Sequence, residues 1–146
     1  MLRNIEAETR HFPLTVIVAD KHPIARAALA SLLTYDGYQV FQADSVKAAV
    51  SHINYNENLS VLIADLEMSD WRSIVRHAVR KTDALLIGME GNHPISEMYD
   101  LHERGLRLCL QKPINYNDVR RAIEENVLHR PAPKLRLVAE SSSIPS

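Results

Sequence analysis

Short apolar runs alternate with longer segments of helical spacing along most of this chain. The runs are continuous and rich in β-branched residues, as is typical of strands covered on both faces. They cover residues 14–19, 38–41, 59–64, 84–88 and 106–110. Because each run is followed by a segment of helical spacing, the order predicts an α/β fold with a parallel sheet and right-handed crossovers.

The segments between the runs carry apolar residues at helical spacing. They predict helices from Pro23 to a stop at Asp36-Gly37, over 46–53, 71–80 and 94–104, and after Pro113 as far as Val127. Proline suits a first helical turn and glycine suits a helix end, so Pro23, Gly37 and Gly105 mark boundaries. The apolar faces of these helices include Ile24, Leu32 and Val79.

A chain of 146 residues predicts one domain. We expect an N-terminal extension over 1–13, the domain over 14–128, and a flexible tail or linker over 129–146. The tail contains Pro131, Pro133 and three consecutive serines, a composition typical of linkers. It is too short for an output domain, so the chain either stands alone, with a protein contact as its output, or is part of a longer protein.

Charge, cysteine content and motifs exclude several functions. The formal net charge of −1 indicates no basic surface for direct nucleic-acid binding, and the single cysteine, Cys109, excludes an intramolecular disulfide. No apolar run approaches the roughly 18 residues of a membrane span, and no signal-peptide core is present. The expectation is a cytoplasmic protein that does not contact membranes. Without a P-loop or a GxGxxG motif, a nucleotide- or flavin-binding enzyme is disfavoured.

Charged residues follow three of the predicted strands. Asp20 follows the first strand, Asp65 the third and Lys112 the fifth. A single aspartate at a strand end is usually a turn or cap residue. In an open parallel sheet, however, the carboxyl ends of the strands are where ligands bind. Two carboxylates and one ammonium at these ends therefore predict a shared cleft.

Three segments around these residues carry a family resemblance. They read VADKHPIAR over 18–26, LIADLEMS over 62–69 and QKPI over 111–114. With these motifs in this order, residues 14–128 resemble a response-regulator receiver domain of the CheY-like type. The resemblance implies a flavodoxin-like, doubly wound five-stranded sheet in the order 2-1-3-4-5, with helices on both faces.

The resemblance also implies roles for single residues. Asp65 matches the aspartate that accepts a phosphoryl group from a histidine kinase or phosphotransfer protein, and Lys112 matches the lysine that pairs with that group. Asp20, Asp65 and the backbone carbonyl of Glu67 would hold Mg²⁺, a cation that prefers oxygen ligands. The Lys112-Pro113 bond is expected to be cis. Such a chain signals through protein contacts and is not an enzyme.

Three positions depart from the family pattern. Lys21 replaces the second acid after the first strand, which predicts weak or absent Mg²⁺ binding. Lys21 either neutralises Asp65 or its phosphoryl group, or lies in solvent. Met89, with Gly88 as the neighbouring option, falls where the family has a threonine or serine. Cys109 falls at the switch tyrosine or phenylalanine. Apolar packing is the simpler interpretation of both Met89 and Cys109.

Two functions therefore stay open. One is a receiver in a two-component phosphorelay that is phosphorylated on Asp65 and contacts a downstream protein. The other is a pseudo-receiver that binds partners without phosphorylation. In either case the fourth helix, fifth strand and fifth helix offer a surface for a partner or a homodimer, which includes Tyr99, Leu101, Tyr116 and Val119. His22 is interpreted as a loop residue, and the Glu67 carboxylate could fold toward Lys21 or Lys112.

Overall fold

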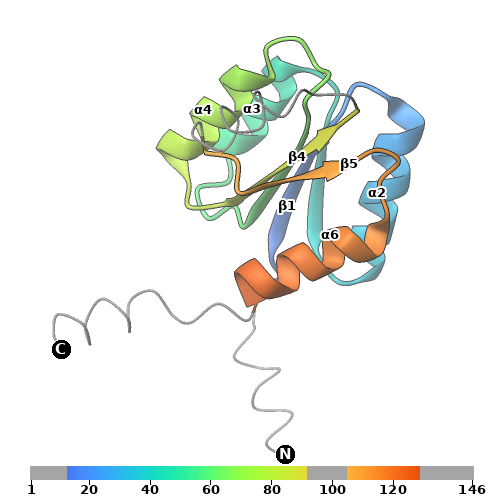
Figure 1. Ribbon diagram of the computed structural model, residues 1–146. Coiled ribbons are helices and arrows are strands. Elements are labelled where there is room, and N and C mark those ends of the chain that lie inside the picture. Colours follow the sequence, from blue (N-terminus) through green and yellow to red (C-terminus); the bar gives the residue numbers. More distant parts are fainter. Residues whose placement is uncertain (1–12, 92–104, 129–146) are drawn as a thin grey trace, which may run out of the picture.

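A computed structural model describes residues 13–91 and 105–128 of this chain. Its centre is a parallel five-stranded sheet in the order β2-β1-β3-β4-β5 (Figure 1). The strands are β1 (Thr15–Ala19), β2 (Gln39–Ala43), β3 (Val61–Asp65), β4 (Leu85–Glu90) and β5 (Leu108–Gln111). The predicted fold class and strand order are confirmed.

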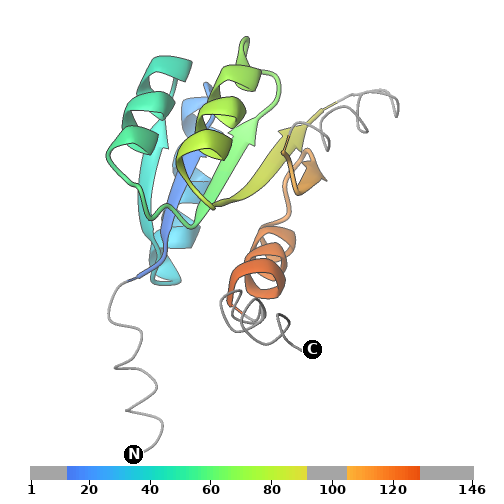
Figure 2. The same ribbon diagram turned by 90° about the vertical axis from the view of Figure 1, so that its left-hand side faces the viewer.

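Helices cover both faces of the sheet. They are α2 (Pro23–Tyr35), α3 (Val46–Asn54), α4 (Trp71–Lys81) and α6 (Tyr116–Ile123), which continues into a π-helical turn, η1 (Glu124–Leu128). Figures 1 and 2 show α3 and α4 side by side on one face and α2 with α6 on the other. The last helix was expected to stay α-helical as far as Val127, but its final turn is π-helical.

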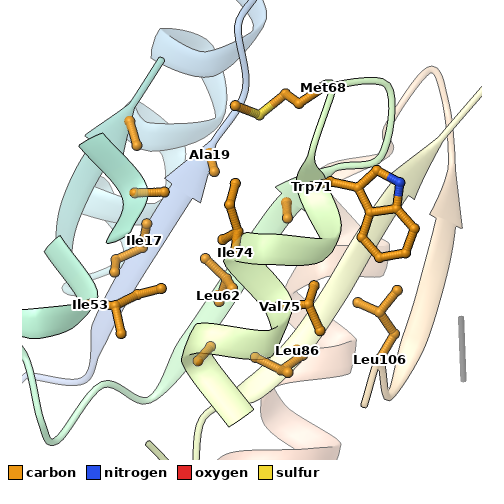
Figure 3. Close-up of a cluster of buried hydrophobic side chains, with 14 of the residues drawn as sticks. Ile17, Ala19, Ile53, Leu62, Met68, Trp71, Ile74, Val75, Leu86 and Leu106 are labelled. Carbon is orange, nitrogen blue, oxygen red and sulfur yellow. The ribbon is translucent and has the colours of Figure 1, made fainter. Parts of the chain in front are cut away.

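Each strand contributes side chains to two separate cores. Along β1, Ile17 and Ala19 pack with α3 and α4, whereas Val16 and Val18 pack with α2 and α6. Both sets are fully buried, because successive side chains of a strand point to opposite faces. Figure 3 shows the first core, where Trp71 at the start of α4 lies among buried aliphatic side chains. This agrees with the prediction that central strands read as uninterrupted apolar runs.

Three apolar side chains predicted on inward helix faces are exposed. Ile24 is 86% exposed, Val79 is 50% exposed and Leu32 is 45% exposed. A helix buries only one stripe against the sheet, and that stripe on α2 is formed by Leu29, Ala30 and Leu33. On α2, Leu32 lies at the border of this stripe and Ile24 lies in solvent.

The fourth strand is longer than its apolar run. It continues through Met89, which is in register with Asp65, and Glu90, which is in register with Gln111. Glu90 is buried even though it carries a carboxyl group. The apolar run 84–88 therefore predicts a strand that is two residues too short at its carboxyl end.

Some expectations concern residues outside the described ranges. These are the helix over 94–104 with Tyr99 and Leu101, the N-terminal extension and the C-terminal tail.

Gly37 and Gly105 have φ values of 99° and 112°, which are readily available only to glycine. Among the described residues, no helix is both long and apolar enough to cross a membrane.

Candidate functional site

The carboxyl ends of β1 and β3 bring two aspartates together. The strands are neighbours, with Ala19 opposite Ala64, so the next residues, Asp20 and Asp65, emerge at the same edge of the sheet. Both side chains are buried. Burial of a carboxylate is costly unless it is paired, so the partners of these two groups determine what the site can do.

The two oxygens of Asp65 differ in their contacts. Oδ1 accepts a hydrogen bond of 2.7 Å from Lys112 Nζ and one of 3.0 Å from the backbone N–H of Glu67. Oδ2 is buried and accepts no hydrogen bond within the described ranges. Buried polar atoms are nearly always partnered. Asp65 therefore presents one oxygen held in place and one oxygen ready for a ligand.

The ion pair sets the charge of both partners. Burial raises the pKa of Asp65, but the hydrogen bonds from Lys112 and Glu67 together with the lysine charge outweigh it, so the pKa lies below its usual value. Burial lowers the pKa of Lys112, while the Asp65 hydrogen bond and carboxylate charge raise it above its usual value. At neutral pH the site thus holds a carboxylate and an ammonium in contact.

Asp20 is fixed by the loop that follows β1. Its Oδ1 accepts a 2.9 Å hydrogen bond from the backbone N–H of His22, and its carbonyl accepts one of 2.9 Å from the Arg26 guanidinium. Burial is the main cause that raises the pKa of Asp20, and the Asp65 carboxylate raises it further. Ligand atoms of Asp20, His22 and Asp65 all lie within 4.8 Å of one another.

Lys112 enters the site from the end of β5. Its backbone N–H donates to the carbonyl of Glu90 over 2.8 Å, and the following bond to Pro113 is cis, as the resemblance implied. Lys112 Nζ also lies 3.5 Å from Glu67 Oε1. A Cβ atom on Gly91 would collide with Glu67 Oε2. The Glu67 carboxylate therefore folds toward Lys112, over a glycine that leaves it room.

Lys21 does not enter the site. Its side chain is exposed, and within the described ranges it forms neither an ion pair nor a hydrogen bond with Asp65. Lys112 is the cation that contacts Asp65. Of the two interpretations of Lys21, the geometry matches the solvated one. The position of the family's second acid is left without a carboxylate.

The two other departures from the family pattern behave as apolar residues. Met89 is buried and packs with the core under α2 and α6. Cys109 is partly exposed rather than fully buried, and it packs at the edge of the core under α3 and α4. Burial, with the nearby Glu90 carboxylate, raises the pKa of the Cys109 thiol to about 11. The thiol is therefore protonated at neutral pH, unlike a reactive cysteine.

A groove of about 450 Å³ opens beside Asp20 and Lys112. One wall is the face of α2 with Leu29 and Leu32, and the other contains Ile114 and Tyr116 at the start of α6. Asp20, Glu67 and Lys112 are the charged residues that line the groove. Tyr116 joins the walls, because its hydroxyl donates a 2.7 Å hydrogen bond to Asp36 Oδ2 after α2.

Two residues of this region were not predicted as part of it. His22 was interpreted as a loop residue, yet its ring lies next to both aspartates. The Asp-x-His spacing directly after a buried strand could have indicated this. Glu90 is buried with an Oε1 atom that has no hydrogen-bond partner in the described part of the chain. The signal here was a carboxylate at the end of a central strand.

Comparison with known families identifies the fold independently. A family model described as "response regulator receiver domain" matches residues 16–124. No curated protein sequence is significantly similar to this chain.

Solved structures agree in architecture. A response regulator receiver domain protein from Clostridium thermocellum is 22% identical, with a TM-score of 0.74, over 86% of this chain and 99% of that one. A response regulator receiver protein from Pseudomonas putida is 22% identical, with a TM-score of 0.68, over 79% and 98%. NtrX from Brucella abortus is 19% identical, with a TM-score of 0.71, over 86% of this chain and 29% of that one.

Proposed function

This chain belongs to the response regulator receiver domain family, and on that premise we propose that it accepts a phosphoryl group on Asp65 from a histidine kinase or phosphotransfer protein. It then acts through contact with a downstream protein. The acceptor role requires no catalytic turnover by this chain. It also matches the two-component signalling in which receiver domains take part.

One observation carries the proposal. Asp65 is fully buried, and its Oδ2 atom is without a hydrogen-bond partner among the described residues, while Oδ1 is held by Lys112 and the Glu67 N–H. A structural aspartate would use both oxygens. An acceptor needs one oriented oxygen free to attack, with its charge retained at neutral pH. The lowered pKa of Asp65 meets the second condition.

The proposed step is a direct phosphoryl transfer. Asp65 Oδ2 forms a bond to phosphorus as the bond between phosphorus and the donor's imidazole nitrogen breaks, and the electron pair of that bond stays on the imidazole. Negative charge is spread over the phosphoryl oxygens in such a transfer. The Lys112 ammonium, a compact cation next to the acceptor, would lie against those oxygens and stabilise them.

The donor set beside Oδ2 suits a divalent cation. Asp20 and Asp65 face each other closely enough to perturb each other's pKa, and two buried carboxylates in contact call for a proton or a cation between them. Asp20, Asp65 and the backbone carbonyl of Glu67 would hold Mg²⁺. That ion would neutralise charge on the phosphoryl oxygens. With Lys21 in place of the second acid, we expect weak Mg²⁺ binding.

The groove supports the partner assignment. Its apolar walls lead from the exposed side of α2 to the charged end at Asp20 and Lys112. Ile24 adds an exposed apolar side chain on α2. A helix of a kinase or phosphotransfer protein that presents a phosphohistidine would bury its apolar face here. Its imidazole would then lie next to Asp65.

A second function is supported by Met89 and Cys109. Neither carries a hydroxyl group, so the usual coupling of phosphorylation to the surface of β5 and α6 lacks its parts. The chain would then be a pseudo-receiver that binds a partner, or a second copy, without phosphorylation. Within the described ranges, Tyr116 and Val119 belong to α6, but Val119 is buried and does not contribute to a docking surface.

Phosphorylation can be tested with a small phosphodonor. The full chain is incubated with acetyl phosphate and Mg²⁺, and its intact mass is measured. We expect the mass to increase by one phosphoryl group. The Asp65→Asn variant removes the acceptor oxygen and should gain nothing, whereas Asp44→Asn, which replaces a carboxylate in the turn before α3, should be modified as the parent is.

The alternative function predicts the opposite result. If an ordinary receiver is modified under the same conditions and this chain is not, the phosphoacceptor proposal fails and the pseudo-receiver remains. Modification that persists in Asp65→Asn would also refute the assignment of Asp65.

A further inference from the structure

We propose that His22 supplies a nitrogen ligand to the cation site of Asp20 and Asp65, so that the site prefers a borderline transition metal, with Zn²⁺ as the expected ion, over Mg²⁺. The proposal concerns the same cleft as the proposed function. It assigns to His22 a role that would replace the family's missing second acid.

The geometry places three donor groups around one point. A ring nitrogen of His22 and one carboxylate oxygen each of Asp20 and Asp65 lie within 4.8 Å of one another. Zn²⁺ binds nitrogen and oxygen ligands at roughly 2.0–2.2 Å, so ligands of one ion lie up to about 4 Å apart. His22 is exposed at the N-cap of α2. An exposed ring has room to move closer to the two carboxylates when an ion binds.

The buried oxygen of Asp65 gives independent support. Asp65 is fully buried and its Oδ2 atom has no hydrogen-bond partner in the described part of the chain. Oδ1 is already held by Lys112, so Oδ2 is the oxygen left to face Asp20. On Asp20, Oδ1 accepts the N–H of His22, which leaves Oδ2 for an ion. The contact that orients Asp20 also fixes the position of His22.

The chemistry of the donors determines the metal. Mg²⁺ prefers oxygen ligands in a nearly ideal octahedron, and this chain offers a solvated lysine where a further acid would stand. Imidazole is a good ligand for Zn²⁺, Ni²⁺ and Co²⁺, and their affinities for mixed nitrogen and oxygen sites exceed those of the harder cations. With Lys21 at the acid position and a nitrogen donor supplied by the next residue, His22, the preference shifts away from Mg²⁺.

Co²⁺ is the probe for the test, because its visible absorption reports nitrogen ligation and coordination geometry. The full chain, freed of metal by a chelator, is titrated with Co²⁺ and separately with Mg²⁺. We expect one Co²⁺ site with a visible absorption band, displaced by Zn²⁺. Loss of an outer-shell partner of a metal costs about 10–100-fold in affinity, so His22→Ala should weaken Co²⁺ binding by at least tenfold.

The variants separate His22 from the other histidines. His77→Ala is the matched control, because His77 lies partly exposed on α4 and its ring bonds to Asn54. This variant should bind Co²⁺ as the parent does. His22→Gln keeps a side chain of similar length without the imidazole and should lose the band as His22→Ala does. Thermal unfolding without metal verifies that each variant is folded. Unchanged Co²⁺ affinity in both His22 variants would overturn the proposal.

Failure of this inference and failure of the proposed function give different results. A chain that gains a phosphoryl group on Asp65 but binds Co²⁺ equally well without His22 would retain the proposed function and refute the metal assignment. A chain that binds Co²⁺ through His22 but never gains a phosphoryl group would support the metal assignment and refute the proposed function.

Discussion

At the scale of single residues, Lys112 determines the state of Asp65. The ammonium is 22% exposed and the carboxylate is fully buried, so most of the cost of placing a charge in the interior falls on Asp65. Lys112 offsets that cost with a 2.7 Å hydrogen bond. The same contact leaves Oδ2 free. An acceptor that is charged, oriented and left with one unpartnered oxygen among the described residues thus follows from one lysine.

Lys112→Met tests the strength of this pair. Removal of one partner leaves a buried carboxylate uncompensated, which typically costs about 3–5 kcal/mol. The lowered pKa of Asp65 stabilises the fold above its usual pKa of 3.8, and this contribution is lost as pH falls through the folded-state value. We therefore expect a large loss in the free energy of unfolding at pH 7 that shrinks below pH 4.

Urea denaturation of the parent and of Lys112→Met, at pH 7 and at a pH below 4, measures the difference in their free energies of unfolding. Lys47→Met, which replaces an exposed lysine of α3, is the control and should change little. A Lys112→Met loss that is equally large at acid pH would show that packing of the lysine stem, rather than the charge pair, was removed.

At the scale of elements, the loops after the strands and helices fix where the site residues emerge. Gly105 precedes β5, and its φ is 112°. A Cβ at this position would lie 2.7 Å from Cγ2 of Val79 on α4. The glycine therefore allows β5, which carries Lys112 at its end, to approach α4 closely.

Gly105→Ala and Gly37→Ala form a matched pair for this element. Both glycines have positive φ, but a Cβ on Gly37 would have no atom within 4 Å. Strained backbone conformations cost about 1–3 kcal/mol, which both variants should show. Gly105→Ala should lose more stability than Gly37→Ala, because the Val79 side chain must also move. Thermal or chemical unfolding compares the two variants. An equal loss of stability would mean that Val79 can move away from the new methyl group at no energetic cost.

Particular elements show what the sequence could and could not predict. The strands were recognisable because central parallel strands are buried on both faces, and Val61–Asp65 is buried throughout. Their ends were less certain, since β4 continues through a buried glutamate. Val79 is half exposed, which shows that helical spacing identifies the buried stripe of a helix but not where that stripe ends. The strand order came from the family resemblance and not from the pattern.

The site was predictable to a similar extent. Asp20, Asp65 and Lys112 follow strands whose ends meet, so their convergence could be expected. The direction of a loop side chain could not. Lys21 and His22 are consecutive and both exposed, yet the His22 ring lies next to the aspartates while Lys21 forms no contact with Asp65 among the described residues. Backbone dihedral angles of the loop decide this, and the sequence does not state them.

At the scale of the whole molecule, the cleft lowers the stability of the fold that contains it. Burial and the Asp65 carboxylate raise the pKa of Asp20, so the folded state holds its proton more tightly than the unfolded state. As pH rises from 3.8 through the raised folded-state pKa, Asp20 therefore reduces the free energy of unfolding.

Asp20→Asn removes this charge and retains an oxygen for the His22 N–H. Without metal, the variant should therefore be more stable than the parent at pH 7. The gain should vanish below pH 3.8. Chemical denaturation in a chelating buffer measures both, and a variant less stable than the parent at pH 7 would mean that Asp20 supports the fold rather than the function.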